Sequence, residues 1–153
     1  MIDSGIRPSP ELVEFVQGWE SCRLSAYLDG NGVPTIGWGH TLGVRMGNTI
    51  TQAQADTWLI EELVEYGEGL KVYMVREPDQ QQFDGILSLA YNAGLRAIGK
   101  SGLMALFNAG DDDGCADRFL AWNKDGGVAV RGLTKRRWAE RAIYLDADYS
   151  GRP

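Results

Sequence analysis

The segment WESCRLSAYLDGNGVPTIGWGHT, from Trp19 to Thr41, changes from a helical to an extended pattern within a few residues. Glu20 directly follows an apolar, helix-like run, and Asp29 opens a turn rich in Gly and Asn. Thr35 comes just after that turn, in a strand-like run. Two acids and a hydroxyl in quick succession make this segment the first candidate for a functional site.

The residues before this segment predict a helix that ends near Glu20. Ser9 is a suitable cap, and Pro10 suits the first helical position. The apolar side chains recur at i, i+3, i+4 and i+7, which defines one buried face: Leu12, Phe15, Val16 and Trp19. Apolar neighbours favour a protonated Glu20, whereas a nearby arginine favours its carboxylate, and the sequence leaves open which effect is larger.

Residues 25–40 predict a short β-hairpin around the turn that Asp29 opens. A hairpin of this size needs support from helices, so we expect it to bring Asp29 and Thr35 back toward the helix that ends at Glu20. His40 is the only histidine. We expect it to bond to the backbone or to a side chain that fixes the β-element, rather than to act as a base.

The rest of the chain is helical in pattern. We expect the N-terminal helix and β-lobe at about 9–50, a connecting helix at about 51–74 and a C-terminal helical lobe at about 79–146. Within that lobe we expect an acidic loop at 111–114. The expected helices are 79–94, 101–109, 115–122 and 134–145. The predicted fold class is therefore α+β and predominantly helical, with a small β-hairpin-containing lobe and a larger helical lobe joined by a long helix.

Composition narrows the classes of function. The net charge of −6 argues against a nucleic-acid-binding protein, although residues 118–141 hold seven basic residues against two acidic ones. That basic segment could be a solvated helix face, or it could face a polyanion or a catalytic carboxylate, and the sequence favours neither interpretation. Cys22 and Cys115 lack CxxC spacing, so we expect free thiols and no metal site, with a disulfide left open.

No apolar run has the length of a signal peptide or a membrane span. We therefore expect a protein that is made in the cytosol and does not insert stably into a membrane.

Hydrolysis of a glycosidic bond needs one carboxylic acid to protonate the leaving oxygen and a second carboxylate to activate water or attack the sugar. Glu20 and Asp29 meet this requirement in type, and one apolar and one polar environment would give them different protonation states. Spacing alone is weak evidence, because most acids on a protein surface are merely solvated.

The pattern ExxxxxxxxDxxxxxT followed by GxGHT resembles the phage-type lysozymes, or endolysins, of glycoside hydrolase family 24. The similarity continues in ITQAQADTWL (50–59), QQFDGILSLAYNAG (81–94) and GLTKRRWAERAIYL (132–145). This resemblance implies one lysozyme-like domain over residues 1–153 that cuts the β-1,4 bond after N-acetylmuramic acid in peptidoglycan, without a cofactor.

The resemblance also implies roles for individual residues. Glu20 would be the general acid, Asp29 would orient or deprotonate the attacking water, and Thr35 would hold that water. The reaction would invert the anomeric configuration. Arg136 matches the family arginine that pairs with the catalytic glutamate, and Arg137 is the competing choice.

Three residues and the function itself each have an alternative interpretation. Asn92 could bind a sugar in the cleft or simply end its helix. Trp122 and Trp138 could be sugar platforms, but we favour core packing for both. A silent peptidoglycan-binding module and a lytic transglycosylase are the rival functions.

The resemblance further implies how the protein meets its substrate. We expect a monomer that stays in the host cytoplasm until a holin permeabilises the membrane. It would then act on the periplasmic cell wall.

Overall fold

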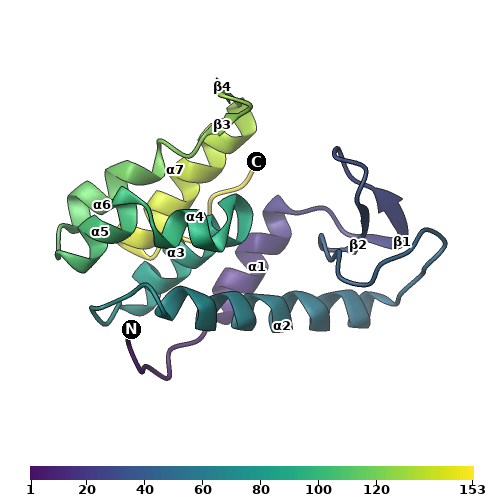
Figure 1. Cartoon of the computed structure of the whole chain (residues 1–153), viewed down its shortest axis with the longest axis horizontal. Helices are drawn as coiled ribbons and strands as arrows, with labels where there is room; N and C mark the ends of the chain where they lie inside the picture. Colours follow the sequence, from purple (N-terminus) through teal and green to yellow (C-terminus); the bar gives the residue numbers. More distant parts are fainter.

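The structure, a computed structural model, describes all residues from 1 to 153. Figure 1 shows a small hairpin of β1 (Arg23–Leu28) and β2 (Pro34–Gly37) at one end, a group of helices at the other, and the long helix α2 (Gln52–Lys71) running beneath both. The predicted α+β, mainly helical fold class is confirmed. The other elements are α1 (Pro10–Trp19), α3 (Gln80–Ala93), α4 (Leu95–Gly99), α5 (Gly102–Asn108), α6 (Asp112–Phe119), β3 (Lys124–Asp125), β4 (Val128–Ala129) and α7 (Arg131–Asp146).

Helix α1 forms as the sequence predicts. Ser9 is its N-cap, and its Oγ accepts the backbone N–H of Leu12 at 3.1 Å. The helix stops at its C-cap, Glu20, which has an extended backbone. The buried side chains of α1 are Leu12, Phe15 and Val16, each 0% exposed. Burying each contributes roughly 1.5–3 kcal/mol.

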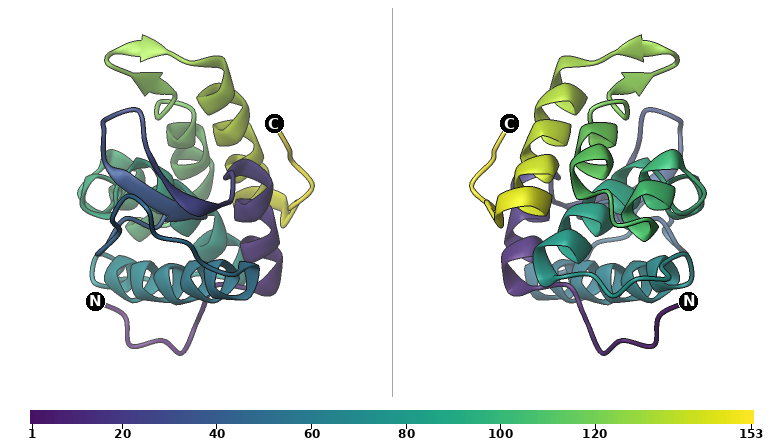
Figure 2. Two further views of the ribbon diagram at one scale, coloured as in Figure 1. Left: turned by 90° about the vertical axis from the view of Figure 1, so that its right-hand side faces the viewer. Right: turned by 90° about the vertical axis from the view of Figure 1, so that its left-hand side faces the viewer.

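A buried carboxyl group ties the start of α1 to the helical lobe and to the C-terminal segment. Asp84, on α3, is 0% exposed and accepts the hydroxyl protons of Ser9 and Tyr149, each at 2.6 Å. Burial raises the pKa of Asp84, although these hydrogen bonds oppose the rise. Figure 2 shows the C-terminal segment running back along α7. The start of α1 and the C-terminal segment are thus anchored on the same helix, α3.

The β-lobe, residues 23–50, is an antiparallel hairpin fastened to α2. Tyr27 pairs with Thr35 across the two strands, and the segment 48–50 bonds to the other edge of β1 through two backbone hydrogen bonds of 2.9 Å. Gly37 has φ +64°, a conformation that favours glycine, and a Cβ there would meet Ala55 of α2 at 3.3 Å. The hairpin therefore lies close against the start of α2.

Helix α3 is the centre of the helical lobe, since every residue from 82 to 90 is buried. Its contact with α7 is close at Gly85, where an added Cβ would meet Tyr144 Cβ at 3.0 Å and the Glu140 carbonyl oxygen at 3.1 Å. The two helices can approach this closely because position 85 has no side chain.

Several predicted boundaries were wrong. Helix α2 ends at Lys71 rather than near 74. The expected acidic loop at 111–114 is largely the first turn of α6, because the Asp111 side chain accepts the N–H of Gly114 at 2.9 Å and caps the helix. Helix α7 begins at Arg131 rather than 134, since the Thr134 hydroxyl bonds back to the Val130 carbonyl instead of capping.

The two candidate platform tryptophans have different environments. Trp122 is half-buried and packs against the core, as we favoured. Core packing was wrong for Trp138, which is 53% exposed and lies 5.3 Å from the Arg141 guanidinium carbon. The reason is that charged side chains, Arg137 and Glu140, take the buried positions of α7.

Neither cysteine is in a disulfide: Cys22 is half-buried, and burial raises the pKa of the Cys115 thiol to about 11. None of the helices combines the length and the apolar character needed to cross a bilayer.

We predict that Gly85→Ala lowers the free energy of unfolding by about 1–3 kcal/mol, because the added methyl group forces α3 and α7 apart. Gly132→Ala is the matched control, since its Cβ would meet nothing within 4 Å on α7. Urea unfolding followed by circular dichroism measures both. Equal stability of the two variants would contradict the close packing at Gly85.

Candidate active site

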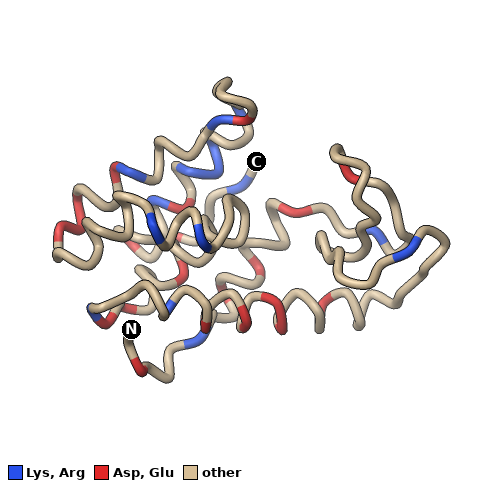
Figure 3. Tube along the Cα trace, in the orientation of Figure 1, with Lys and Arg blue, Asp and Glu red and all other residues tan.

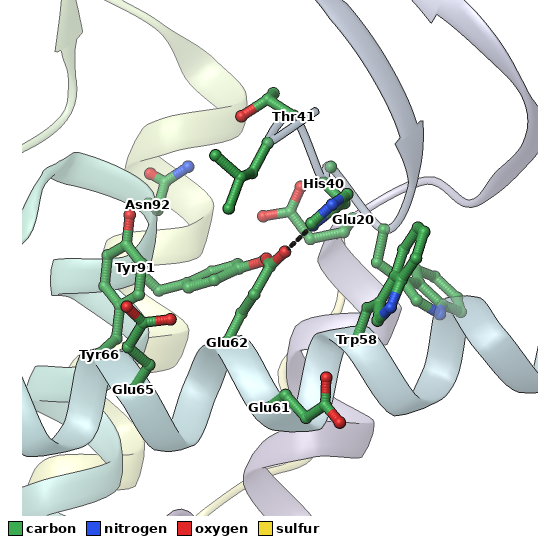
Figure 4. A pocket seen from close by; sticks show the side chains of 13 residues that line it. Glu20, His40, Thr41, Trp58, Glu61, Glu62, Glu65, Tyr66, Tyr91 and Asn92 are labelled. Carbon is green, nitrogen blue, oxygen red and sulfur yellow. Dashed lines mark hydrogen bonds and ion pairs between the residues drawn. The ribbon is translucent and has the colours of Figure 1, made fainter. Parts of the chain in front are cut away.

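A cleft of about 640 Å³ lies between the β-lobe and the helices α2 and α3. Figure 4 shows Glu20 and His40 on one side, Tyr91 and Asn92 on the other, and acidic side chains rising from α2 below. Its lining consists of Glu20, Trp38, Gly39, His40, Thr41, Leu42, Trp58, Glu61, Glu62, Glu65, Tyr66, Tyr91 and Asn92.

Glu20 enters the cleft from the C-terminal end of α1. Its backbone N–H donates to the Val16 carbonyl at 2.9 Å, which closes the helix and fixes the position of the side chain. The Glu20 side chain is 26% exposed and lines the cleft. Its Oε1 accepts Nη1 of Arg136 at 2.9 Å, although 116 residues separate the two.

Arg136, rather than Arg137, is thus the arginine beside Glu20. Arg137 is also buried, but it donates to the Trp122 carbonyl at 2.6 Å and to Oδ1 of Asn92. Both arginines contact Glu140, which is 0% exposed. The basic segment is therefore partly a solvated helix face and partly a partner of carboxylates. Arg131 and Lys135 are exposed, whereas the buried Arg136 and Arg137 contact Glu20 and Glu140.

Asp29 is fixed by its own turn. Its Oδ1 accepts the backbone N–H groups of Asn31 at 2.8 Å and Val33 at 2.9 Å, whereas Oδ2 makes no hydrogen bond within the chain. The Val33 carbonyl accepts both the N–H of Asp29 at 3.0 Å and the hydroxyl of Thr35 at 2.9 Å. One peptide group therefore holds the acid and the hydroxyl in a fixed relation.

The structure brings Glu20, His40 and Asn92 to one cleft and places Arg136 behind Glu20. Asp29 and Thr35 do not line that cleft; they lie at the turn end of the hairpin, with Thr35 only 4% exposed.

His40 connects the β-lobe to α2. Its Nδ1 contacts Oε1 of Glu62, its ring lies 4.3 Å from that of Trp58, and its backbone pairs with Ile36. The second oxygen of Glu62 accepts the hydroxyl of Tyr91 at 3.1 Å. Burial, followed by the negative charge of Glu62, raises the pKa of Tyr91 well above its ordinary value, so the phenol stays protonated and donates.

The sequence did not predict that three acidic residues of α2, Glu61, Glu62 and Glu65, line the cleft. Figure 3 shows acidic residues along α2, whereas most of the basic residues lie on the helical lobe. Glu61, Glu62 and Glu65 have the spacing of one helix face, but that spacing alone is also typical of a solvated surface. No group of three or more His, Cys, Asp or Glu side chains is arranged to hold a metal ion.

We predict that His40→Ala lowers the free energy of unfolding by about 2 kcal/mol, because it removes the contact with Glu62 and the tilted ring contact with Trp58 and leaves Glu62 with one partner. Thr41→Ala is the control, since Thr41 is an exposed neighbour lining the same cleft. Hydrogen exchange of the β-lobe amides should show faster opening in the first variant only. Unchanged exchange in His40→Ala would contradict a connecting role.

Comparison with known proteins agrees with this geometry. The family model described as Phage lysozyme matches residues 17–140. The endolysin of Salmonella phage P22 is 38% identical over 132 residues, covering 82% of this chain and 89% of the relative. The endolysin of Bacillus phage B103 is 34% identical over 142 residues, covering 89% of this chain; the chain spans only 53% of that longer relative.

Among solved structures, the endolysin from Escherichia coli O157:H7 phage FAHEc1 superposes with a TM-score of 0.87 at 31% identity, covering 99% of both chains. The family match spans most of the sequence, including both acids, the hairpin, and Arg136 and Arg137 of α7. The chain therefore belongs to the phage lysozyme family, whose members are glycoside hydrolases.

Proposed function

We propose that the protein is an endolysin muramidase that hydrolyses the β-1,4 bond between N-acetylmuramic acid and N-acetylglucosamine in peptidoglycan. The observation that carries this proposal is the carboxyl group of Glu20, which opens into the cleft while a buried arginine holds one of its oxygens. Membership of the phage lysozyme family supports the same substrate.

Glu20 is the general acid in this proposal. Its free oxygen, Oε2, protonates the glycosidic oxygen, while Oε1 stays on Arg136. After the proton has left, the arginine stabilises the resulting carboxylate. The ion pair thus holds the Glu20 side chain in one orientation both before and after the proton is transferred.

Asp29 and Thr35 prepare the water. Asp29 Oδ2 has no partner within the chain and can accept a proton from the water, whereas its other oxygen is fixed by two backbone N–H groups. The Thr35 hydroxyl donates to Val33, which leaves its lone pairs to accept the second hydrogen of the same water. Because Asp29 and Thr35 lie outside the lining of the cleft, at the turn end of the hairpin, the scissile sugar has to reach beyond that lining toward the turn in this proposal. A water held there between the two acceptors attacks from the face opposite Glu20, and the product is inverted.

The cleft can also hold the sugar chain. The rings of Trp58, Tyr66 and Tyr91 offer apolar faces for pyranose rings, and Tyr66 and Tyr91 support each other edge to face at 5.2 Å. The Asn92 Oδ1 accepts an N–H of Arg137, which leaves the amide N–H groups of Asn92 free to donate to a sugar oxygen.

We further propose that the enzyme works as a monomer. Its delivery follows that of holin-dependent endolysins: it remains in the host cytoplasm until the membrane is permeabilised and then reaches the periplasmic wall. The endolysin relatives from phages support this route. Cells expressing the protein should stay intact until the membrane is breached, and lysis without a breach would contradict the route.

We predict that digestion of purified peptidoglycan gives muropeptides with reducing N-acetylmuramic acid ends, detected by mass spectrometry. Anhydro-muramic ends would identify a lytic transglycosylase instead. Binding without release of any fragment would identify a silent binding module. Proton NMR of the first-formed product should show the α-anomer; initial β-anomer would overturn inversion.

We predict that Glu20→Gln lowers kcat/KM by about 100-fold to 10,000-fold, because the amide cannot deliver a proton. Asp29→Asn should cause a loss of similar size if hydrolysis needs the activated water. Glu14→Gln makes the same change at an exposed position of α1 and should retain full activity. Release of reducing ends measures all three; full activity of Glu20→Gln would exclude the proposed acid.

A further inference from the structure

Glu140 is a fully buried carboxylate behind the cleft. It is 0% exposed, and its oxygens contact three side chains from two helices. Oε2 accepts the hydroxyl of Ser88 on α3 and lies 3.4 Å from Nε of Arg136, while Oε1 contacts Nη1 of Arg137. Removing a charge of this kind from water is costly, so it persists in a fold only where cations and donors compensate it.

The two arginines that Glu140 holds point to different groups of the cleft. Arg136 uses Nη1 for the Glu20 carboxylate, and Arg137 uses Nη2 for the Asn92 amide oxygen. Glu140 therefore contacts two arginines, of which one bonds to the acid, Glu20, and the other bonds to Asn92, which lines the cleft.

The four charged groups of this cluster balance one another. Arg136 and Arg137 supply two positive charges, and Glu20 and Glu140 supply two negative ones, so the net charge is zero when all are ionised. Three of the four are at most 5% exposed, and screening by solvent is weak there. A change of charge at Glu140 or Arg137 is thus felt at Glu20.

We propose that Glu140 is a positioning residue that sets the orientation of Arg136 and limits how much positive charge Glu20 experiences. It holds one N–H edge of Arg136, so that Nη1 is directed at Glu20, and it offsets the charge of Arg137. This inference rests on the proposed role of Glu20 as the acid.

Other titratable groups surround Glu20, and the test leaves each of them unchanged. They come from the loop after β2, from α2 and from α3, and all line the same cleft: His40, Glu61, Glu62, Glu65, Tyr66 and Tyr91. Around Glu140, α3 contributes Ser88, and α7 contributes the two arginines.

The test is the pH profile of kcat/KM on purified peptidoglycan for two variants with opposite charge changes. Glu140→Gln leaves the arginine charge unbalanced, which favours the Glu20 carboxylate. The basic limb, where the acid loses its proton, should move to lower pH by about one unit. Arg137→Gln removes a positive charge and should move that limb to higher pH. A loss of stability alone would not give shifts of opposite sign.

Two further variants serve as controls. Glu140→Asp keeps the charge and should return the limb toward the wild-type position. Asp117→Asn, on α6, removes a charge that pairs with Arg141 of α7, makes no contact with Glu140 or its two arginines, and should leave the limb in place. Circular dichroism establishes that each variant is folded at the assay temperature.

A folded Glu140→Gln with the wild-type limb overturns the inference. If Glu140→Gln does not fold, Arg137→Gln decides: a limb at higher pH supports the proposal, and an unmoved limb overturns it. An inactive wild-type protein, or full activity of Glu20→Gln, would instead overturn the proposed function, so the two failures are distinguishable.

Discussion

The ion pair between Glu20 and Arg136 is the contact on which the arrangement of the site depends. It joins the end of α1 to α7 across 116 residues of sequence, and the arginine is almost fully buried. A buried guanidinium is stable only when its charge is compensated, so Glu140 is part of the same requirement. The acid of the cleft is therefore positioned by the C-terminal helix as much as by its own.

The β-lobe needs a second set of contacts, because a hairpin of this size does not hold its own position. Trp38 donates to Asp56 at 2.8 Å, and His40 contacts Glu62, so two side chains of the lobe bond directly to α2. Since α2 also packs on the helical lobe, it sets where the turn of Asp29 lies relative to Glu20. In the proposed reaction, the acid and the water-activating carboxylate thus belong to parts joined mainly through one helix.

Local patterns in the sequence predicted those features that depend on neighbouring residues. The cap at Ser9, the apolar face of α1 and the hairpin turn at Asp29 are all of this kind, and they place Glu20 at a helix end. The motif with Thr35 and the GxGHT segment added the family, which composition and spacing alone did not reach.

Features that depend on distant partners could not be predicted in this way. Arg137 and Glu140 look like solvated helix residues until Asn92 and Ser88 from α3 are placed beside them. Their burial leaves Trp138 exposed, which reverses what hydrophobicity predicts. The resemblance favoured Arg136 but kept Arg137 as the competing choice. Adjacent helical residues differ in direction by about 100°, so only the packing of α7 decides which one reaches Glu20.

The most direct measurement is a crystal structure of the Glu20→Gln variant with a peptidoglycan fragment that spans the scissile bond. The account predicts the glycosidic oxygen within hydrogen-bonding distance of residue 20, with Asp29, Thr35 and a shared water on the opposite face of the muramic acid ring. A fragment bound with its glycosidic oxygen away from residue 20, or with Asp29 out of reach of any water near the anomeric carbon, would contradict it.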